Sequence, residues 1–512
     1  MGQVPLVDQS ADEAPNDLMT GDSYLESLRD GRQVFVDGEF VKDVTTHPAF
    51  ANAARSIAHL YDALHHPDTK DLMTTVDRYT GYRVHRFFTP AHSPEELLRA
   101  RDAIEHWARL GYGFMNRTPD YNASFMAGLA VTHDFYEPFG DNARAWYEKY
   151  ARQGLSVSHA IVSPPVDRAR SSHEIRDVHL KVVEERVDGI VVEGARLMAT
   201  ASALTNVAFV GQSHVSDLDT GTADDMALAF MAPLNTPGMK VVCRTSYESK
   251  ATSPFDNPLS SRFDENDAVL VFDNVFIPWE SVLIHRDTER IHQCFPHSDL
   301  LSRGYFQGAI RRSVKLQFMA GILDRGTRIN GTDGLRDVQA GLGELLAWRH
   351  QTWAVTSAMA LDPESGPAGT VLPRMDYAAG YRALAPLSWE RTHRFFEEHL
   401  AGALLMTPSS GKDLQNPELR PLLDRYYRGT GATAEERTKL FKLAWDAIGT
   451  EFGARHELYD LNYTDRPDQV RLDTLNWSRD AGLLDTYGDL VQKAMDDYDL
   501  DGWIRGRWAQ EN

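Results

Sequence analysis

The segment at residues 116–121 brings together side chains that could act on a bound molecule. It reads Asn-Arg-Thr-Pro-Asp-Tyr and follows a predicted helix, which Pro119 interrupts. The turn therefore presents Arg117, which stays cationic at physiological pH, close to the phenol of Tyr121, which can donate a hydrogen bond. A purely structural interpretation is also open, because Arg117 could instead pair with Asp120.

A second segment, residues 158–168, adds a histidine. It reads Ser-His-Ala-Ile-Val-Ser-Pro-Pro-Val-Asp-Arg and places His159 where the chain enters a strand-rich region. An imidazole titrates close to neutral pH, so it can accept or share a proton during a reaction. The alternative is a hydrogen-bonded core histidine with no part in chemistry.

Several other kinds of site are absent from the sequence. No phosphate-binding G-x-x-x-x-G-K-[ST], dinucleotide-binding G-x-G-x-x-G or hydrolase G-x-S-x-G motif occurs. A tightly held dinucleotide in a Rossmann domain is therefore not expected. The histidines that could suggest a metal match no known ligand spacing, so we expect no metal site; they are His65, His66, His292 and His297.

Composition narrows the class of protein. The 512 residues carry a formal net charge of −21, and no stretch gathers Lys and Arg as a nucleic-acid binder requires. Only two cysteines occur, Cys243 and Cys294, which excludes a disulfide framework and fits a reducing compartment. No apolar run is long enough to span a membrane, and no signal peptide is evident at the start. We therefore expect a soluble cytoplasmic protein that binds neither nucleic acid nor membrane.

The elements that must position these residues follow from periodicity. Residues 20–150 have a helical pattern, with a strong helix start at Ser93-Pro94-Glu95-Glu96. Short β-branched runs between residues 178 and 279 predict strands, and Asp188-Gly189 predicts a hairpin turn. Beyond residue 284 the period is helical again, with long helices expected at 304–325, 335–361, 375–404 and 434–451.

This order predicts an α+β protein in three parts. We expect a helical N-terminal domain at residues 1–155 and an antiparallel β domain at 156–283; the spacing of the strands suits a β-barrel or a sandwich, and we expect the β-barrel. A helical bundle with a C-terminal oligomerisation segment should follow at 284–512.

The chain resembles the 4-hydroxyphenylacetate 3-hydroxylase family over nearly its whole length. Six motifs in order carry the resemblance, and together they are specific where one alone would be weak. They are residues 117–121, 158–168, 194–200 (Gly-Ala-Arg-Leu-Met-Ala-Thr), 258–267 (Pro-Leu-Ser-Ser-Arg-Phe-Asp-Glu-Asn-Asp), 272–280 (Phe-Asp-Asn-Val-Phe-Ile-Pro-Trp-Glu) and 449–459 (Gly-Thr-Glu-Phe-Gly-Ala-Arg-His-Glu-Leu-Tyr).

The resemblance implies a fold, a cofactor and partners. The fold would be like that of the acyl-CoA dehydrogenases, assembled as a homotetramer. The chain would be the large oxygenase component of a two-component monooxygenase. It would bind reduced FAD loosely, receive it from a separate NAD(P)H:flavin reductase, and use O₂ as co-substrate. Oxygen would reach the ring from a C4a-hydroperoxide of the flavin, and the phenol would be hydroxylated ortho to its hydroxyl group.

The resemblance also implies site residues. Arg117, Tyr121 and His159 match the family's substrate site and would act in catalysis. Flavin contacts would come from His159, Ile161, Pro165, Arg168, Thr200, Gly449, Thr450, Glu451 and Phe452, and the substrate tail would lie near Ser213 and His214. The family often has Asn-Pro-Gln where this chain has Ser163-Pro164-Pro165, so residue 165 lacks the amide side chain that would contact the flavin and keeps only a backbone contact.

Two questions stay open at this point. The substrate could be free 4-hydroxyphenylacetate or a chlorophenol. It could equally be a tyrosyl or β-tyrosyl unit on a peptidyl carrier protein, as in the branch that serves actinomycete antibiotic and enediyne biosynthesis. The alternative enzyme class is an acyl-CoA-dehydrogenase-like flavoenzyme, which would need a tightly held FAD and a carboxylate base.

Overall fold

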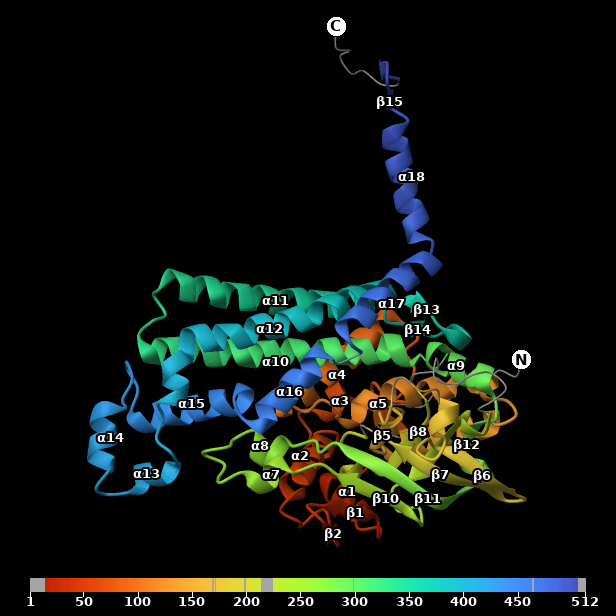
Figure 1. The fold of residues 1–512 in the computed structure, drawn as a ribbon, viewed down its shortest axis with the longest axis horizontal. Coiled ribbons are helices and arrows are strands. Elements are labelled where there is room, and N and C mark those ends of the chain that lie inside the picture. The colour runs from red at the N-terminus through yellow and green to blue at the C-terminus, as the bar shows by residue number, and fades with distance from the viewer. Residues whose placement is uncertain are drawn as a thin grey trace.

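Figure 1 shows the computed structural model as sheets and short helices on one side, long helices on the other, and a helical arm that projects from the body. The structure describes residues 14–167, 170, 172–197, 199–212, 224–297, 299–462 and 465–504. Within these ranges no helix combines the length and the apolar character that crossing a lipid bilayer requires.

The N-terminal part is mostly helical, as its periodicity predicts. The expected start at Ser93 is present: its hydroxyl accepts a hydrogen bond from the amide of Glu96 at 3.3 Å, and Pro94 occupies the first turn. The helices are α1 (Gly21–Ser27), α2 (Ala51–Asp62), α3 (Lys70–Met73), α4 (Pro94–Leu110), α5 (Pro119–Met126) and α6 (Gly140–Gln153), with a small hairpin of β3 (Thr74–Val76) and β4 (Arg83–His85).

The strands of the middle part form two open sheets. One has the order β2 (Glu39–Val41), β1 (Gln33–Val36), β10 (Met239–Cys243), β11 (Ala268–Pro278), β7 (Gly189–Arg196) and β6 (Lys181–Arg186). The other has the order β12 (Val282–His285), β9 (Leu228–Pro233), β8 (Val207–Val210) and β5 (Val157–Ala160).

Two expectations about these sheets need correction. The described strands do not close into a barrel, so that prediction is wrong for this part of the chain. The pairing is also mixed rather than antiparallel throughout, because β1 runs parallel to β10 and β5 runs parallel to β8. Parallel neighbours come from distant segments, here the N-terminal β1 and the end of the first helical part, so local periodicity could not reveal them.

The long helices lie where the sequence predicts them. They are α10 (Leu300–Asn330), α11 (Arg336–Leu361) and α12 (Met375–Leu405), which run side by side in Figure 1, and α15 (Ala434–Ile448), which packs on α10 and α12. The short α9 (Thr288–His297) leads into them, and α13 (Gly411–Gln415) and α14 (Arg420–Tyr426) lie in the connection from α12 to α15. The helix expected at 434–451 is divided: α15 ends at Ile448, and α16 (Glu451–Leu461) begins after Gly449 and Thr450.

One apolar core joins these parts. Side chains from the N-terminal helices, both sheets and the bundle belong to a single contiguous cluster, with Trp107, Phe230 and Trp389 fully buried in it. The chain then leaves the body through α17 (Pro467–Asp480) and α18 (Leu483–Met495), followed by a hairpin of β15 (Tyr498–Asp499) and β16 (Gly502–Trp503). No side chain of α18 is buried.

Candidate active site where α5, β5 and α16 meet

The turn between α4 and α5 holds Arg117 in place through two backbone contacts. Gly113 has φ +75°, and a Cβ there would lie 2.6 Å from the backbone nitrogen of Lys315, so this turn lies directly against α10. The carboxylate of Glu265 accepts hydrogen bonds from the amides of Asn116 and Arg117, both at 2.6 Å. Burial raises the pKa of Glu265, and these two amides and nearby cations partly offset that.

The guanidinium of Arg117 lies between two phenol rings. Its central carbon is 3.8 Å from the ring centroid of Tyr121 and 4.9 Å from that of Tyr459, a cation–π arrangement on each side. It also donates a hydrogen bond to the hydroxyl of Tyr459. Tyr459 belongs to α16, so the cation joins residues more than 300 positions apart.

His159 completes the cluster from β5. Its ring centroid lies 5.7 Å from that of Tyr121, and its Nδ1 lies 3.2 Å from Oδ1 of Asn122 on α5. Burial, together with the nearby charge of Arg117, lowers the pKa of His159 to about 3. The imidazole is therefore neutral near pH 7, whereas the sequence suggested a group that titrates there.

The structure thus brings the side chains of Arg117, Tyr121 and His159 together, and their roles in a reaction stay predictions. Asp120, the structural alternative for Arg117, accepts instead from the hydroxyl of Thr118 and from the amide of Gln307 at 3.1 Å. Neither the hydroxyl of Tyr121 nor Nε2 of His159 makes a hydrogen bond within the described part of the chain.

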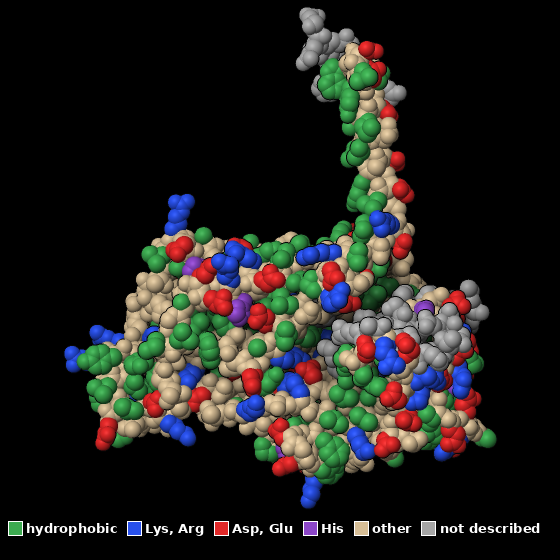
Figure 2. All heavy atoms as spheres, in the orientation of Figure 1, with side chains coloured by type: hydrophobic (Ala, Val, Ile, Leu, Met, Phe, Trp, Pro, Cys, Tyr) green, Lys and Arg blue, Asp and Glu red, His purple; other side chains and the backbone are tan. Residues whose placement is uncertain are grey.

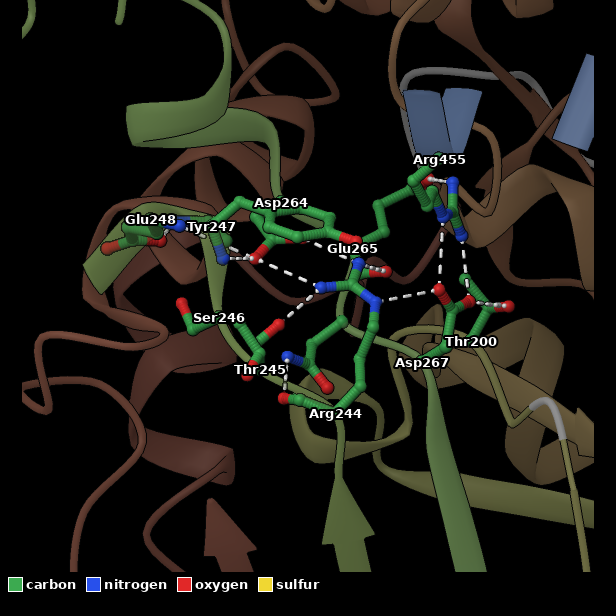
Figure 3. A network of polar contacts seen from close by, with 12 residues as sticks. Thr200, Arg244, Thr245, Ser246, Tyr247, Glu248, Asp264, Glu265, Asp267 and Arg455 are labelled. Atoms are coloured by element: carbon green, nitrogen blue, oxygen red, sulfur yellow. Dashed lines mark hydrogen bonds and ion pairs between the residues drawn. The ribbon is translucent and has the colours of Figure 1, made fainter. Parts of the chain in front are cut away.

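A second polar cluster surrounds Thr200 (Figure 3). The hydroxyl of Thr200 donates to Asp267 at 2.7 Å, and the same carboxylate accepts from Arg455 of α16 at 2.8 Å and from Arg244 at 3.0 Å. Burial opposes ionisation of Asp267, but Arg455 and Arg244 outweigh it and hold its pKa well below the usual range. Arg244 also donates to Asp264 at 2.8 Å. Because Asp267 directly precedes β11 and binds Arg455 of α16, the cluster joins the start of β11 to α16.

The predicted flavin segment at 449–452 forms the break between α15 and α16. Thr450 caps α16, accepting from the amide of Gly453 at 3.3 Å. The amides before Gly453 in this helix have no acceptor within the helix, as at any helix N-terminus. A cavity of about 230 Å³ adjoins the segment, lined by Tyr247, Lys250, Ala251, Asn257, Ser260, Thr450, Glu451 and Phe452.

The remaining residues predicted to contact the flavin or the substrate tail lie outside these two clusters or outside the described part of the chain. Ile161 follows β5 and packs against the main core, while Pro165 lies in an exposed stretch. Arg168, Ser213 and His214 lie outside the described residues, so the predicted flavin contact and substrate-tail contacts at these positions stay predictions.

Behind the cluster lies a buried group of charges that the sequence did not reveal. Arg311, Arg312 and Lys315 of α10 surround the carboxylate of Asp460, at 3.3, 3.2 and 2.5 Å, and all four side chains are almost fully buried. Burial lowers the pKa of Lys315 to about 7, although Asp460 opposes the shift. Two guanidinium groups and a partly protonated Lys315 around one carboxylate leave this side of the site positively charged.

Two further residues of the site could not be assigned a role from sequence. Tyr459 is the last residue of a recognised motif, but only the fold shows that its hydroxyl meets Arg117. Asn122 follows Tyr121 directly, and no pattern signals that it reaches His159.

Family models match almost the whole chain. The 4-hydroxyphenylacetate 3-hydroxylase N-terminal model matches residues 20–284, and the C-terminal model of the same family matches residues 291–495.

Known relatives are similar from end to end. The pyoverdin chromophore biosynthetic protein PvcC of Pseudomonas aeruginosa is 50% identical, over 97% of this chain and 99% of its own length. The (3S)-3-amino-3-(3-chloro-4-hydroxyphenyl)propanoyl-[peptidyl-carrier protein SgcC2] monooxygenase of Streptomyces globisporus is 45% identical, over 95% and 92%. Among solved structures, the oxygenase component HpaB of 4-hydroxyphenylacetate 3-monooxygenase, complexed with FAD and 4-hydroxyphenylacetate, superposes with a TM-score of 0.87. It is 30% identical and covers 93% of this chain and 99% of its own.

Proposed function

This chain belongs to the 4-hydroxyphenylacetate 3-hydroxylase family. From that premise we propose that it hydroxylates a 4-hydroxyphenyl ring beside its hydroxyl group, and that Arg117, Tyr121 and His159 form the site that binds and ionises the phenol. It is the oxygenase component of a two-component monooxygenase, with FAD as cofactor and O₂ as co-substrate. The observation that supports the proposed site best is the convergence of a cation, a phenol and a neutral imidazole from three elements.

The three side chains suit the chemistry of a phenol. A ring carbon beside the hydroxyl group becomes a much better nucleophile when the phenol ionises. Arg117 supplies a fixed positive charge for the phenolate oxygen, and Tyr121 has a hydroxyl group free to donate to it. His159 is neutral near pH 7 and can accept the phenol proton, and a phenolate beside it would then stabilise the imidazolium.

The residues around Thr200 and Thr450 fit a flavin. Reduced FAD, when bound, activates O₂ and supplies the oxygen atom. The donors are the N–H groups of Arg455 that Asp267 does not use and the first amides of α16, and they suit ring carbonyls and a negatively charged reduced ring. The hydroxyl of Thr200 gives its proton to Asp267, so toward a flavin its oxygen can only accept. The cavity next to Thr450 is smaller than most small-molecule sites, so it would take only part of FAD. Loose binding of that kind agrees with a flavin delivered by a separate reductase.

The acyl-CoA-dehydrogenase-like alternative receives no support from the site. That chemistry requires a carboxylate available as a base. Glu265, the acidic residue that contacts the Arg117 turn, already accepts from the amides of Asn116 and Arg117.

The substrate is a small phenol, and two forms of it are in keeping with the relatives. HpaB binds free 4-hydroxyphenylacetate, whereas the S. globisporus enzyme acts on a β-amino acyl group held on a peptidyl carrier protein. The partners of this chain are therefore a flavin reductase and, for a tethered substrate, a carrier protein.

We also propose a homotetramer, supported by an uncovered apolar side of α18. Its large apolar residues recur at helical spacing and are 39–70% exposed: Leu484, Tyr487, Leu490, Val491 and Met495. Figure 2 shows hydrophobic side chains along one side of the projecting arm and acidic ones along the other. Apolar stripes of this kind mark surfaces that another chain covers.

A reconstituted assay tests the function. The purified chain would be combined with a flavin reductase, FAD, NADH and O₂, and offered 4-hydroxyphenylacetate, tyrosine or a carrier protein loaded with a tyrosyl group. We expect one oxygen atom to be added ortho to the phenol hydroxyl group, as detected by mass spectrometry and NMR. If the reductase supplies reduced flavin and O₂ is consumed while every phenol is recovered unchanged, the proposal is wrong.

A further inference from the structure

Asn122 joins two elements of the site. Its side chain is 4% exposed and lies between α5 and β5. Its amide nitrogen Nδ2 donates to the carbonyl oxygen of Val157 in β5 at 2.5 Å, and its Oδ1 lies 3.2 Å from Nδ1 of His159.

The Val157 contact fixes which atom of Asn122 faces the imidazole. If the amide were turned over, its oxygen would face the Val157 carbonyl oxygen at hydrogen-bond distance, and two acceptors would repel each other. The amide oxygen therefore points at His159. Because that oxygen can only accept, Nδ1 must carry the proton, and Nε2 of the neutral ring keeps its lone pair.

We infer that Asn122 is a positioning residue, which holds His159 in the Nδ1–H tautomer so that Nε2 is the atom that takes the proton of the phenol. The inference rests on the proposed function for the identity of the phenol. The tautomer itself follows from the contacts to Val157 and His159 alone.

The proton balance is simple. The phenol O–H bond breaks, an Nε2–H bond forms, and the electron pair stays on the phenolate oxygen. Asn122 accepts from Nδ1–H before and after the transfer, so nothing has to reorganise. Among the described residues, the charged or titratable groups that face the ring are Arg117 and Tyr121, and Arg117 offsets the phenolate charge while opposing the imidazolium.

Two substitutions test this role. Asn122→Leu keeps the approximate size of the side chain but removes the acceptor of Nδ1–H, so the Nδ1–H tautomer of His159 is no longer favoured. Asn122→Asp keeps the acceptor and adds a negative charge, which favours the imidazolium. The control is Asn142→Leu, since Asn142 also donates its amide to backbone carbonyls, of Trp279 at 2.7 Å and Val282 at 2.8 Å, but lies on α6.

The first measurement follows a bound phenol whose anion absorbs visible light. 4-Nitrophenol would be titrated with pH on the FAD-saturated protein, recording the phenolate band by difference absorbance. In Asn122→Leu the apparent pKa of the bound phenol should rise by about one unit. Turnover should fall about 10- to 100-fold, mainly in kcat, as expected when a group that orients a reacting ligand is lost. In Asn122→Asp the acid limb of the pH–rate profile should move toward neutral pH, and Asn142→Leu should change neither quantity.

The second measurement does not depend on the reaction. Solid-state ¹⁵N NMR of histidine-labelled protein, assigned by subtracting the spectrum of His159→Gln, reads which ring nitrogen carries the proton. We expect Nδ1–H in the wild type and a shift toward Nε2–H in Asn122→Leu. An Nε2–H ring in the wild type would overturn the inference even if the phenol is hydroxylated, and so would an unchanged profile in Asn122→Leu. If the wild type hydroxylates no phenol but carries the Nδ1–H ring, the proposed function is refuted and the inference about Asn122 stands.

Discussion

At the scale of single residues, the proposed reaction depends on one neutral base beside one fixed cation. His159 is the only imidazole in the described site that faces Tyr121, and burial together with Arg117 keeps it unprotonated near pH 7. A base in this state is ready for a phenol proton without first losing one of its own.

His159→Ala should therefore separate oxygen activation from oxygen transfer. We expect FAD affinity to change little and hydroxylated product per NADH to fall by about 10²- to 10⁴-fold, because the phenol stays protonated and the activated oxygen is released as hydrogen peroxide. Product and peroxide would be measured in the same reaction. His106→Ala, which removes a partly buried histidine of α4, serves as the control, and normal coupling in His159→Ala would contradict the role of the imidazole.

The charges around Asp460 give a prediction about stability. Asp460→Asn should lower the free energy of unfolding by about 3–5 kcal/mol, because it leaves three buried cations without their anion. Lys315→Met should change it by about 1 kcal/mol or less, since Arg311 and Arg312 still neutralise the carboxylate. Urea denaturation measures both.

The lowered pKa of Lys315 also makes the free energy of unfolding depend on pH. The folded pKa of Lys315, about 7, lies below its ordinary value of 10.5, so the unfolded chain binds more protons between these pH values. Stability contributed by this group therefore rises as pH increases from 7 to 10.5, and Lys315→Met should remove that rise. A variant whose stability changes with pH in parallel with the wild type would contradict the assignment.

The sequence indicated the site residues that lie in motifs, but not those whose place in the site depends on contacts between distant segments. Arg117, Tyr121 and His159 lie in motifs that the family shares, so they could be named before the structure was known. Asn122 and Tyr459 reach His159 and Arg117 only because α5 faces β5 and α16 faces the Arg117 turn. Contacts between distant segments leave no local pattern, and neither does the lowered pKa of His159, which arises from burial.

At the scale of elements, the proposed flavin region depends on the connection between α15 and α8 (Ser260–Phe263). Asp446, fully buried in α15, accepts from the amides of Leu259 and Ser260 at 2.8 and 2.9 Å and from the Ser260 hydroxyl at 2.9 Å. Ser260 and Thr450 both line the cavity beside the predicted flavin segment, so this carboxylate fixes two walls at once.

Asp446→Ala should weaken both stability and flavin binding. Each buried donor left without a partner costs about 1–3 kcal/mol, and the walls of the cavity would no longer be held together. Asp446→Asn keeps one acceptor and should lose less. Thermal unfolding gives the first quantity and FAD titration the second; an unchanged FAD affinity in Asp446→Ala would show that this cavity does not hold the cofactor.

Periodicity predicted most elements and missed how they pair. The runs at 208–210, 227–231 and 240–243 are strands β8, β9 and β10, and the Asp188-Gly189 turn joins β6 to β7. The closed antiparallel barrel was wrong, because β1 and β5 enter the sheets from the helical part as parallel neighbours. The break at 449–450 left a readable signal, since Gly449 followed by a capping Thr450 favours the start of a new helix.

At the scale of the whole molecule, the projecting arm should control assembly. The apolar side of α18 is uncovered in the single chain, and burying it against another copy would gain roughly 1.5–3 kcal/mol for each large side chain. Replacing Leu484 and Val491 by Glu puts charges into that stripe, so we expect the proposed homotetramer to dissociate into smaller species on gel filtration with light scattering. The matched control replaces Asp485 and Asp489, on the other side of α18, by Ala and should leave the assembly unchanged. If the Glu variant keeps the wild-type mass, the arm is not part of the interface, and the apolar stripe must have another partner.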